Sequence, residues 1–208
     1  LSDFTLCALH GELPPDKQDA ALAFSGRRKI IVSTNIAETS LTIDGVTAVV
    51  DSGLAKIARY DGARALNTLF TEKTALPSCE QRAGRAGRTA PGVCVRLWTE
   101  RKQRERPLSL EPEMLRLDLS ETLLALKASG VADFDALRWL DAPRREDASR
   151  ARTLLKELGA IGPDGALSKD GRDMAAYPLH PRYARMTLQS RRLGCEYECA
   201  AIAAAAQG

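Results

Sequence analysis

The sequence has few of the side chains that most metal and redox sites require. Its 208 residues include two histidines and five cysteines, and the cysteines are scattered with no C-x-x-C pair. An odd number of dispersed thiols favours free cysteines in a reducing compartment over disulfides or a zinc site. We therefore expect no metal ion bound by protein side chains, and a cytoplasmic protein.

Two longer patterns are also missing. No apolar run reaches 18 residues and nothing at the N-terminus reads as a signal peptide, so we expect no membrane association. There is no G-x-x-x-x-G-K-[ST] loop to cradle phosphates and no D-E-x-H motif to hold Mg²⁺. Any nucleotide site here would be half of a site, and this chain alone is expected not to hydrolyse ATP.

The composition permits a globular fold and a charged ligand. Apolar residues make up 44% of the chain, which is enough for a core. The net charge of +3 is too small to indicate nucleic-acid binding by itself. The charges are clustered locally, and the clusters are more informative than the sum.

The first hundred residues alternate short apolar segments with helical ones. We expect strands at 4–9, 29–33, 46–51 and 93–97, and a helix from about Leu13 to Phe24. Apolar strands alternating with helices are typical of a parallel sheet covered on both faces. Residues 1–103 are thus predicted to form an α/β domain. Within it, Asp61-Gly62 between two alternating segments predicts a β-hairpin over residues 56–69.

The second half of the sequence is mostly helical. A charged segment, 101–107, is interpreted as a solvated linker at the domain boundary. Helices are expected at 111–117, 119–129 and 148–158, then a turn at 163–165, a helix opened by Ser168 and a further helix ending near Leu193. Helices followed by a small hairpin favour a winged-helix domain over 104–178. Residues 179–208 are predicted to begin another helical domain.

The most informative run is Gln81-Arg82-Ala83-Gly84-Arg85-Ala86-Gly87-Arg88. On a helix, Gln81, Arg85 and Arg88 would lie at i, i+4 and i+7, which is one face. Two glycines inside a helix cost about 1 kcal/mol each relative to alanine, so a close approach of another segment or a ligand is expected there. A solvated basic face explains neither feature. A clamp for phosphate oxygens explains both.

A second candidate segment, 33–45, follows the end of the predicted strand 29–33. Open α/β sheets bind ligands at the carboxyl ends of their strands. The segment is rich in hydroxyl and amide side chains, which suit phosphate and ribose oxygens. Composition alone favours the alternative that these residues cap helices and fill turns.

Together these segments resemble the DEAH-box branch of the superfamily 2 helicases, over essentially all 208 residues. Residues 81–88 resemble motif VI and residues 33–45 match motif V almost letter for letter. Trp-Leu-Asp-Ala-Pro at 139–143 inclines towards the bacterial HrpB-like subgroup. The resemblance implies a second RecA-like lobe with a β-hairpin insertion, a winged helix that braces the lobes rather than entering DNA, and the start of the ratchet domain.

The resemblance also implies roles for individual residues. Gln81 would position the attacking water, and Arg85 and Arg88 would act as arginine fingers. Asp44, Thr42 and Phe24 would contact the nucleotide, although Phe24 could equally be a core residue. The predicted nucleic-acid contacts are His10, Gly11, Thr34, Asn35 and Thr39, with Arg59 and Arg64 on the hairpin.

The predicted function is the C-terminal part of an ATP-dependent helicase. ATP with Mg²⁺ would bind between this lobe and a first RecA-like lobe of the same protein. RNA, single-stranded or partly duplex, is the favoured substrate, with DNA as an alternative. The competing hypothesis is a non-catalytic nucleic-acid-binding or scaffold protein that retains the fold. A scaffold would have no need for Gln81, Arg85 and Arg88 together.

Overall fold

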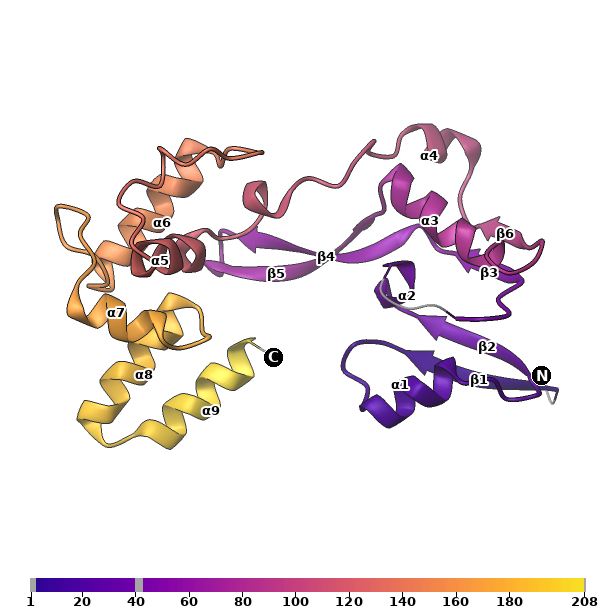
Figure 1. The fold of residues 1–208 in the computed structure, drawn as a ribbon, viewed down its shortest axis with the longest axis horizontal. Helices are drawn as coiled ribbons and strands as arrows, with labels where there is room; N and C mark the ends of the chain where they lie inside the picture. The colour runs from indigo at the N-terminus through magenta and orange to yellow at the C-terminus, as the bar shows by residue number, and fades with distance from the viewer. Residues whose placement is uncertain (1–2, 40–42, 208) are drawn as a thin grey trace. The chain divides into compact units, whose positions relative to one another are not determined.

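The computed structural model describes residues 3–39 and 43–207 and divides into two compact units. Unit 1 comprises Leu1–Ala58 and Thr68–Glu111, and unit 2 comprises Arg59–Asn67 and Pro112–Gly208. Figure 1 traces the elements along the chain. The predicted domain boundaries at 103 and 178 remain predictions. No helix in the described ranges is long and apolar enough to cross a bilayer.

Unit 1 contains two pairs of parallel strands. β1 (Phe4–Leu9) pairs with β2 (Arg28–Ser33), and β3 (Ala48–Asp51) pairs with β6 (Val93–Arg96). α1 (Pro15–Leu22) packs against β1, and α3 (Leu76–Ala86) packs against both β3 and β6. The short helices α2 (Ile36–Thr39) and α4 (Glu100–Arg104) follow β2 and β6. The predicted α/β class with a parallel sheet is confirmed.

The expectation that both faces of the sheet would be covered is wrong for the described chain. Side chains alternate along the strands between more buried and exposed positions. Leu6 is 73% exposed, Val32 64% and Val50 67%. The alternation means that helices cover one face of the strands while the other remains open. An apolar run therefore indicated strands correctly but overstated how much of each strand is buried.

The predicted hairpin consists of β4 (Leu54–Asp61) and β5 (Leu66–Lys73). Its turn is stabilised by the Asp61 carboxylate, whose Oδ1 accepts a hydrogen bond from the Ala63 amide at 2.9 Å. Ala65 completes the turn with a φ of 55°, a left-handed backbone conformation that residues other than glycine rarely adopt. The strand ends nearest the turn, residues 59–67, belong to unit 2.

Unit 2 is mostly helical. The predicted helix at 111–117 is only a 3₁₀ turn, η1 (Glu113–Leu115), which begins after Pro112 because a proline disfavours helical backbone at the residue before it. It is followed by α5 (Ser120–Ala128), α6 (Arg145–Glu157), α7 (Lys169–Ala175), α8 (Pro181–Leu193) and α9 (Glu196–Gln207). Ile161 and Leu167 pair antiparallel across the predicted turn and form a minimal wing. Ser168 caps α7 as predicted, accepting a hydrogen bond from the Gly171 amide at 2.9 Å.

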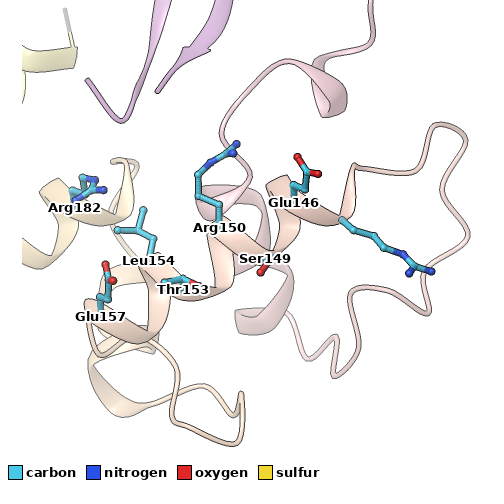
Figure 2. A pocket seen from close by; sticks show the side chains of 8 residues that line it. Glu146, Ser149, Arg150, Thr153, Leu154, Glu157 and Arg182 are labelled. Carbon is cyan, nitrogen blue, oxygen red and sulfur yellow. The ribbon is translucent and has the colours of Figure 1, made fainter. Parts of the chain in front are cut away.

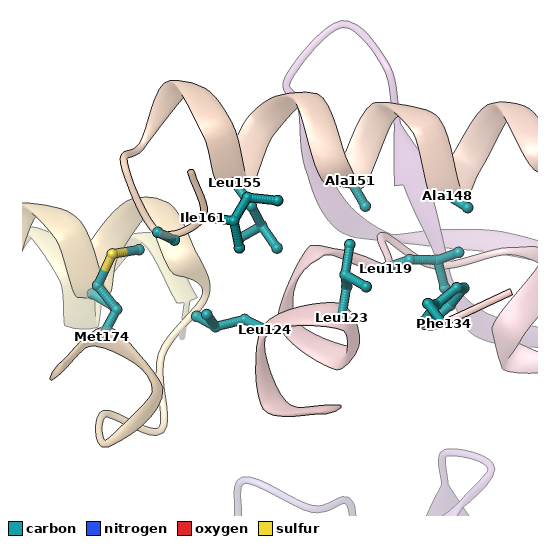
Figure 3. Close-up of a cluster of buried hydrophobic side chains, with 11 residues drawn as sticks. Leu119, Leu123, Leu124, Phe134, Ala148, Ala151, Leu155, Ile161 and Met174 are labelled. Carbon is teal, nitrogen blue, oxygen red and sulfur yellow. The ribbon is translucent and has the colours of Figure 1, made fainter. Parts of the chain in front are cut away.

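The helices of unit 2 enclose a continuous hydrophobic core, shown in Figure 3. Leu123 of α5, Leu155 of α6 and Met174 of α7 are each at most 1% exposed. The packing is close enough to require a glycine on α7, because a Cβ at Gly171 would lie 2.0 Å from the carbonyl oxygen of Ala160. The amphipathic patterns at 119–129 and 148–158 therefore predicted the core-forming helices correctly.

The charged segment 101–107 is mostly exposed, as a solvated linker would be, but Arg106 departs from that prediction. Arg106 is 6% exposed and donates from Nη1 to the carbonyl oxygens of Gly53 at 2.9 Å and Thr74 at 3.0 Å. Its guanidinium carbon lies 3.9 Å from the centre of the Trp98 ring. A buried guanidinium with hydrogen-bonded and aromatic partners is part of the fold. Gly53 and Thr74 lie 53 and 32 residues away in the sequence, so the charge pattern could not reveal them.

Candidate nucleotide and nucleic-acid interface

The carboxyl ends of β1 and β2 bring two predicted nucleic-acid segments together. His10 and Gly11 follow β1, and Thr34 and Asn35 follow β2, whose last residue Ser33 is in register with Leu9. The Thr34 amide donates to the Leu9 carbonyl oxygen at 3.1 Å. His10 is half-buried and the other three residues are exposed. Amides, hydroxyls and an imidazole thus gather at one edge of the strands, as the parallel register requires.

α2 continues from this edge. The Glu38 amide donates to the Asn35 carbonyl oxygen at 3.0 Å, which makes Asn35 part of the helix start. Thr39 is the last residue of α2, and its side chain lies outside the described set. Thr42, predicted to contact the nucleotide, also lies outside the described residues.

α3 carries two of the three predicted catalytic residues. Gln81 and Arg85 lie within the helix, but the helix ends at Ala86 with Gly87 as its C-terminal cap, so Arg88 lies beyond it. The expected single helical face is therefore wrong at Arg88. The cause is the return of the chain after the helix: a Cβ at Gly92 would lie 2.0 Å from the carbonyl oxygen of Ala86. Gln81 and Arg88 are exposed, and Arg85 is half-buried.

Arg85 connects α3 to α2. Its Nε donates to the carbonyl oxygen of Glu38 at 2.9 Å, and Nη2 contacts the same oxygen. The predicted motif VI and motif V segments are therefore in direct contact, although 47 residues separate these two positions. A Cβ at Gly84, one residue before Arg85, would meet no described atom within 4 Å. Within the described chain, no packed neighbour explains that glycine.

Arg82 is a structural residue for which the sequence pattern predicted no role. Its Nε donates to Glu38 Oε2 at 2.9 Å, and its Nη1 donates to Asp51 Oδ1 at 3.0 Å. Nη1 also lies 3.1 Å from the carbonyl oxygen of Leu54, the first residue of β4. The single guanidinium thus joins α2, the end of β3 and the base of the hairpin to α3.

The pKa of Arg82 reflects both its burial and the two carboxylates beside it. The Arg82 and Asp51 side chains are 14% and 2% exposed. Burial lowers the pKa of Arg82, but the hydrogen bonds to Glu38 and Asp51 outweigh it and the pKa is raised above its ordinary value. Arg82 is one of the residues of the run 81–88. Its role depends on carboxylates 44 and 31 residues away, which no local pattern indicates.

The two other predicted nucleotide contacts are accessible. Phe24 is 99% exposed just after α1, so the alternative of a core residue is wrong. Asp44 is exposed in a turn before β3, where Gly45 adopts a φ of 76°. An exposed aromatic ring and an exposed carboxylate can both reach a ligand.

The hairpin arginines differ in their surroundings. Arg59 is half-buried, whereas Arg64 is exposed at the turn with its Nε 3.7 Å from Asp61 Oδ2. An ion pair of that length between neighbours three residues apart contributes little to stability. Arg64 therefore keeps a charge that a nucleic-acid backbone could meet.

A shallow hollow on unit 2 is lined by none of these predicted residues (Figure 2). It runs along α6 and combines Arg145, Arg150 and Arg182 with Glu146 and Glu157. Arg150 is already engaged, with Nη2 2.7 Å from Asp147 Oδ1 and its guanidinium 4.1 Å from the centre of the Tyr60 ring. The mixed charge gives no clear preference for an anion. Among the described residues, no group of three His, Cys, Asp or Glu side chains is arranged to hold a metal ion.

Comparisons with known proteins agree with the fold. A model of the helicase conserved C-terminal domain matches residues 1–90, and a model of the helicase-associated winged-helix domain (HA2) matches residues 151–179. Two crystal structures of Escherichia coli HrpB are each 38% identical to the chain, with TM-scores of 0.82 and 0.89. One is described as a DExH-box NTPase and the other as a DEAH/RHA helicase. Each comparison covers 99% of this chain and 26% of the solved one.

The α/β unit and the winged helix together define a helicase C-terminal module. The chain belongs to the DEAH-box helicases and spans about a quarter of the length of the two solved relatives. The predicted family is confirmed. The roles assigned to individual site residues remain predictions.

Proposed function

We propose that this chain is the second RecA-like lobe, winged helix and start of the ratchet domain of an ATP-dependent nucleic-acid helicase. Domain boundaries at 103 and 178 are part of the proposal. The observation that carries it is the contact between Arg85 and the Glu38 carbonyl oxygen, which joins α3 to the segment after β2. Residues that would meet a nucleotide and residues that would meet a nucleic-acid backbone thus share one connected structure.

The side chains proposed for the nucleotide site suit a nucleoside triphosphate. Arg85 and Arg88 would face the γ-phosphoryl group, and guanidinium groups are suited to oxygens that carry developing charge. Gln81 would orient a water molecule, Phe24 would stack on the base, and Asp44 with Thr42 would contact the nucleotide. Mg²⁺ would offset phosphate charge, and its ligands would come from the first lobe.

The edge formed by His10, Gly11, Thr34 and Asn35, with Thr39, would grip a single strand. Its amides and hydroxyls suit phosphate and sugar oxygens, and contacts of this kind are largely independent of sequence. Arg59 and Arg64 would add charge from the hairpin. RNA is the proposed substrate, DNA is the alternative, and the cytoplasm is the proposed location. The proposed nucleotide site also requires the first RecA-like lobe of the same protein.

Nucleotide turnover by the full-length protein, with and without single-stranded RNA or DNA, tests this proposal. We expect ATP hydrolysis that RNA stimulates more than DNA does, and no turnover by residues 1–208 alone. RNA binding by the full-length protein without ATP hydrolysis would support the scaffold hypothesis instead. Equal stimulation by both nucleic acids would leave the helicase proposal standing and remove the preference for RNA.

A further inference from the structure

The outer part of the hairpin is held by unit 2 through contacts on both of its strands. On β4, the Tyr60 amide donates to the carbonyl oxygen of Arg116 at 2.7 Å. On β5, Asn67 Oδ1 accepts a hydrogen bond from the Asp118 amide at 2.8 Å. The guanidinium of Arg150, from α6, lies 4.1 Å from the centre of the Tyr60 ring. Residues 59–67 accordingly group with unit 2 rather than unit 1.

The segment that receives Asn67 is itself fixed by a buried polar cluster. Asp118, Ser120 and His180 are 8%, 0% and 7% exposed. Asp118 Oδ1 accepts from the Ser120 amide at 2.8 Å and lies 3.4 Å from His180 Nε2. The Ser120 hydroxyl contacts both the Asp118 carboxylate and, at 3.2 Å, His180 Nε2. Such a cluster is rigid when its polar atoms are satisfied.

His180 extends the cluster to the next helix. Its Nδ1 accepts a hydrogen bond from the Arg182 amide at 3.3 Å and so caps the start of α8. The other ring nitrogen, Nε2, faces Asp118 and Ser120. The hairpin, the start of α5 and the start of α8 are therefore linked by a chain of hydrogen bonds.

We propose that Asn67 is a positioning residue: together with Asp118, it fixes the hairpin tip to the helical unit. The tip then moves with that unit and not with the lobe that carries Gln81 and Arg85. The inference rests on the proposed function for its consequence, namely that the hairpin meets a nucleic-acid duplex. Its structural content does not depend on that function. Movement of unit 2 would then reach the duplex through the hairpin, and loss of Asn67 would separate nucleotide turnover from strand separation.

Amide hydrogen exchange in the chain tests the structural content directly. Asn67→Ala removes the acceptor for the Asp118 amide, and we expect exchange at Asp118 and Tyr60 to accelerate about five- to tenfold, the effect of one hydrogen bond. Amides of α3 should exchange as in the wild type. Thr71→Ala, an exposed position of β5 that belongs to unit 1, is the matched control and should change neither amide. Unchanged exchange at Tyr60 in Asn67→Ala would overturn the proposal.

Strand separation and nucleotide turnover by the full-length protein test the consequence. For Asn67→Ala we expect strand separation to fall about fivefold or more while RNA-stimulated turnover stays within about twofold, because the change lies outside the nucleotide residues. A parallel fall in both rates, or no fall in strand separation, would contradict the positioning role. A wild-type protein without turnover would refute the proposed helicase function, and the exchange experiment would still decide whether Asn67 holds the tip.

Discussion

Unit 1 and unit 2 use apolar residues in opposite ways. In unit 2, Leu123, Leu155 and Met174 lie in a closed core, and the polar groups of Asp118 and His180 are buried with partners. In unit 1, Leu6 and Val32 are largely exposed on an open strand face, and the buried charges include the Arg82 cluster beside the candidate site. Unit 2 is held together by its own apolar core. Unit 1 is held by charge at the place where ligands are proposed to bind.

The largest difference in stability is expected between a substitution in the core of unit 2 and a substitution on the open strand face of unit 1. Leu155 is fully buried, so Leu155→Ala should lower the free energy of unfolding of unit 2 by about 2–5 kcal/mol through lost burial and a cavity. Leu6→Ala, at a side chain that is 73% exposed, should cost well under about 1 kcal/mol. Chemical denaturation followed by circular dichroism measures both. Similar losses at the two positions would contradict the contrast between the units.

The Arg82 cluster should be the most sensitive charged feature of unit 1. Arg82→Ala leaves Glu38 and Asp51 without their cation, and Asp51 Oδ2 already has no hydrogen-bond partner within the described structure. We expect a loss of about 2–4 kcal/mol, since removing one member of a buried ion pair leaves the other uncompensated. Arg101→Ala, at a side chain 89% exposed, should change stability by less than about 0.5 kcal/mol. An Arg82→Ala protein as stable as the wild type would show that the cluster does not stabilise unit 1.

The buried carboxylate of unit 2 should give that unit a pH dependence. Burial raises the pKa of Asp118, but hydrogen bonds to His180 and Ser120 outweigh it, so the folded pKa lies below the ordinary value. The stabilisation is therefore complete above the unfolded pKa of about 3.9 and is lost as pH falls through the lower folded value. The difference in the free energy of unfolding between the wild type and Asp118→Asn should become smaller as the solution is acidified. Chemical denaturation at a series of pH values measures this difference, with Asp141→Asn, at an exposed position, as the control substitution.

The smallest effect is expected at the hairpin turn. Ala65 has a φ of 55°, a conformation that costs residues with a Cβ about 1 kcal/mol. Ala65→Gly should remove this strain and, after the added flexibility of the unfolded chain, stabilise the protein by about 0.5 kcal/mol. Ala63→Gly in the same turn has no left-handed strain to relieve and should destabilise instead. Thermal unfolding of the two variants should move in opposite directions.

Local patterns in the sequence predicted most of the elements. Asp61-Gly62 correctly indicated the hairpin, the leucine spacing at 119–129 indicated α5, and Ser168 indicated the start of α7. These features depend on neighbours a few residues apart. A parallel sheet was also predicted, whereas the register of β1 with β2, which brings His10 and Thr34 to the same edge, comes from the structure.

The errors arose where distant residues decide the outcome. The helix of residues 81–88 ends early because Gly92 brings the chain back against Ala86. Arg106 is buried because Trp98, Gly53 and Thr74 surround it. Asn67 and His180 looked unremarkable in sequence because the Asp118 segment that connects them lies 51 and more residues away from either. Each of these contacts requires the folded arrangement.

The central claim is that the α3 region of this chain acts on a bound nucleotide. RNA-stimulated ATP turnover by the full-length protein, compared between wild type and Arg88→Ala, tests it most directly, with Arg101→Ala as the control for removal of an exposed arginine. An arginine finger contributes about 10³-fold or more to the rate, so we predict a loss of that size in Arg88→Ala with RNA binding retained and the control unchanged. Turnover equal to that of the wild type would mean that Arg88 does not act on the phosphoryl group, and the proposed role of this site would be wrong.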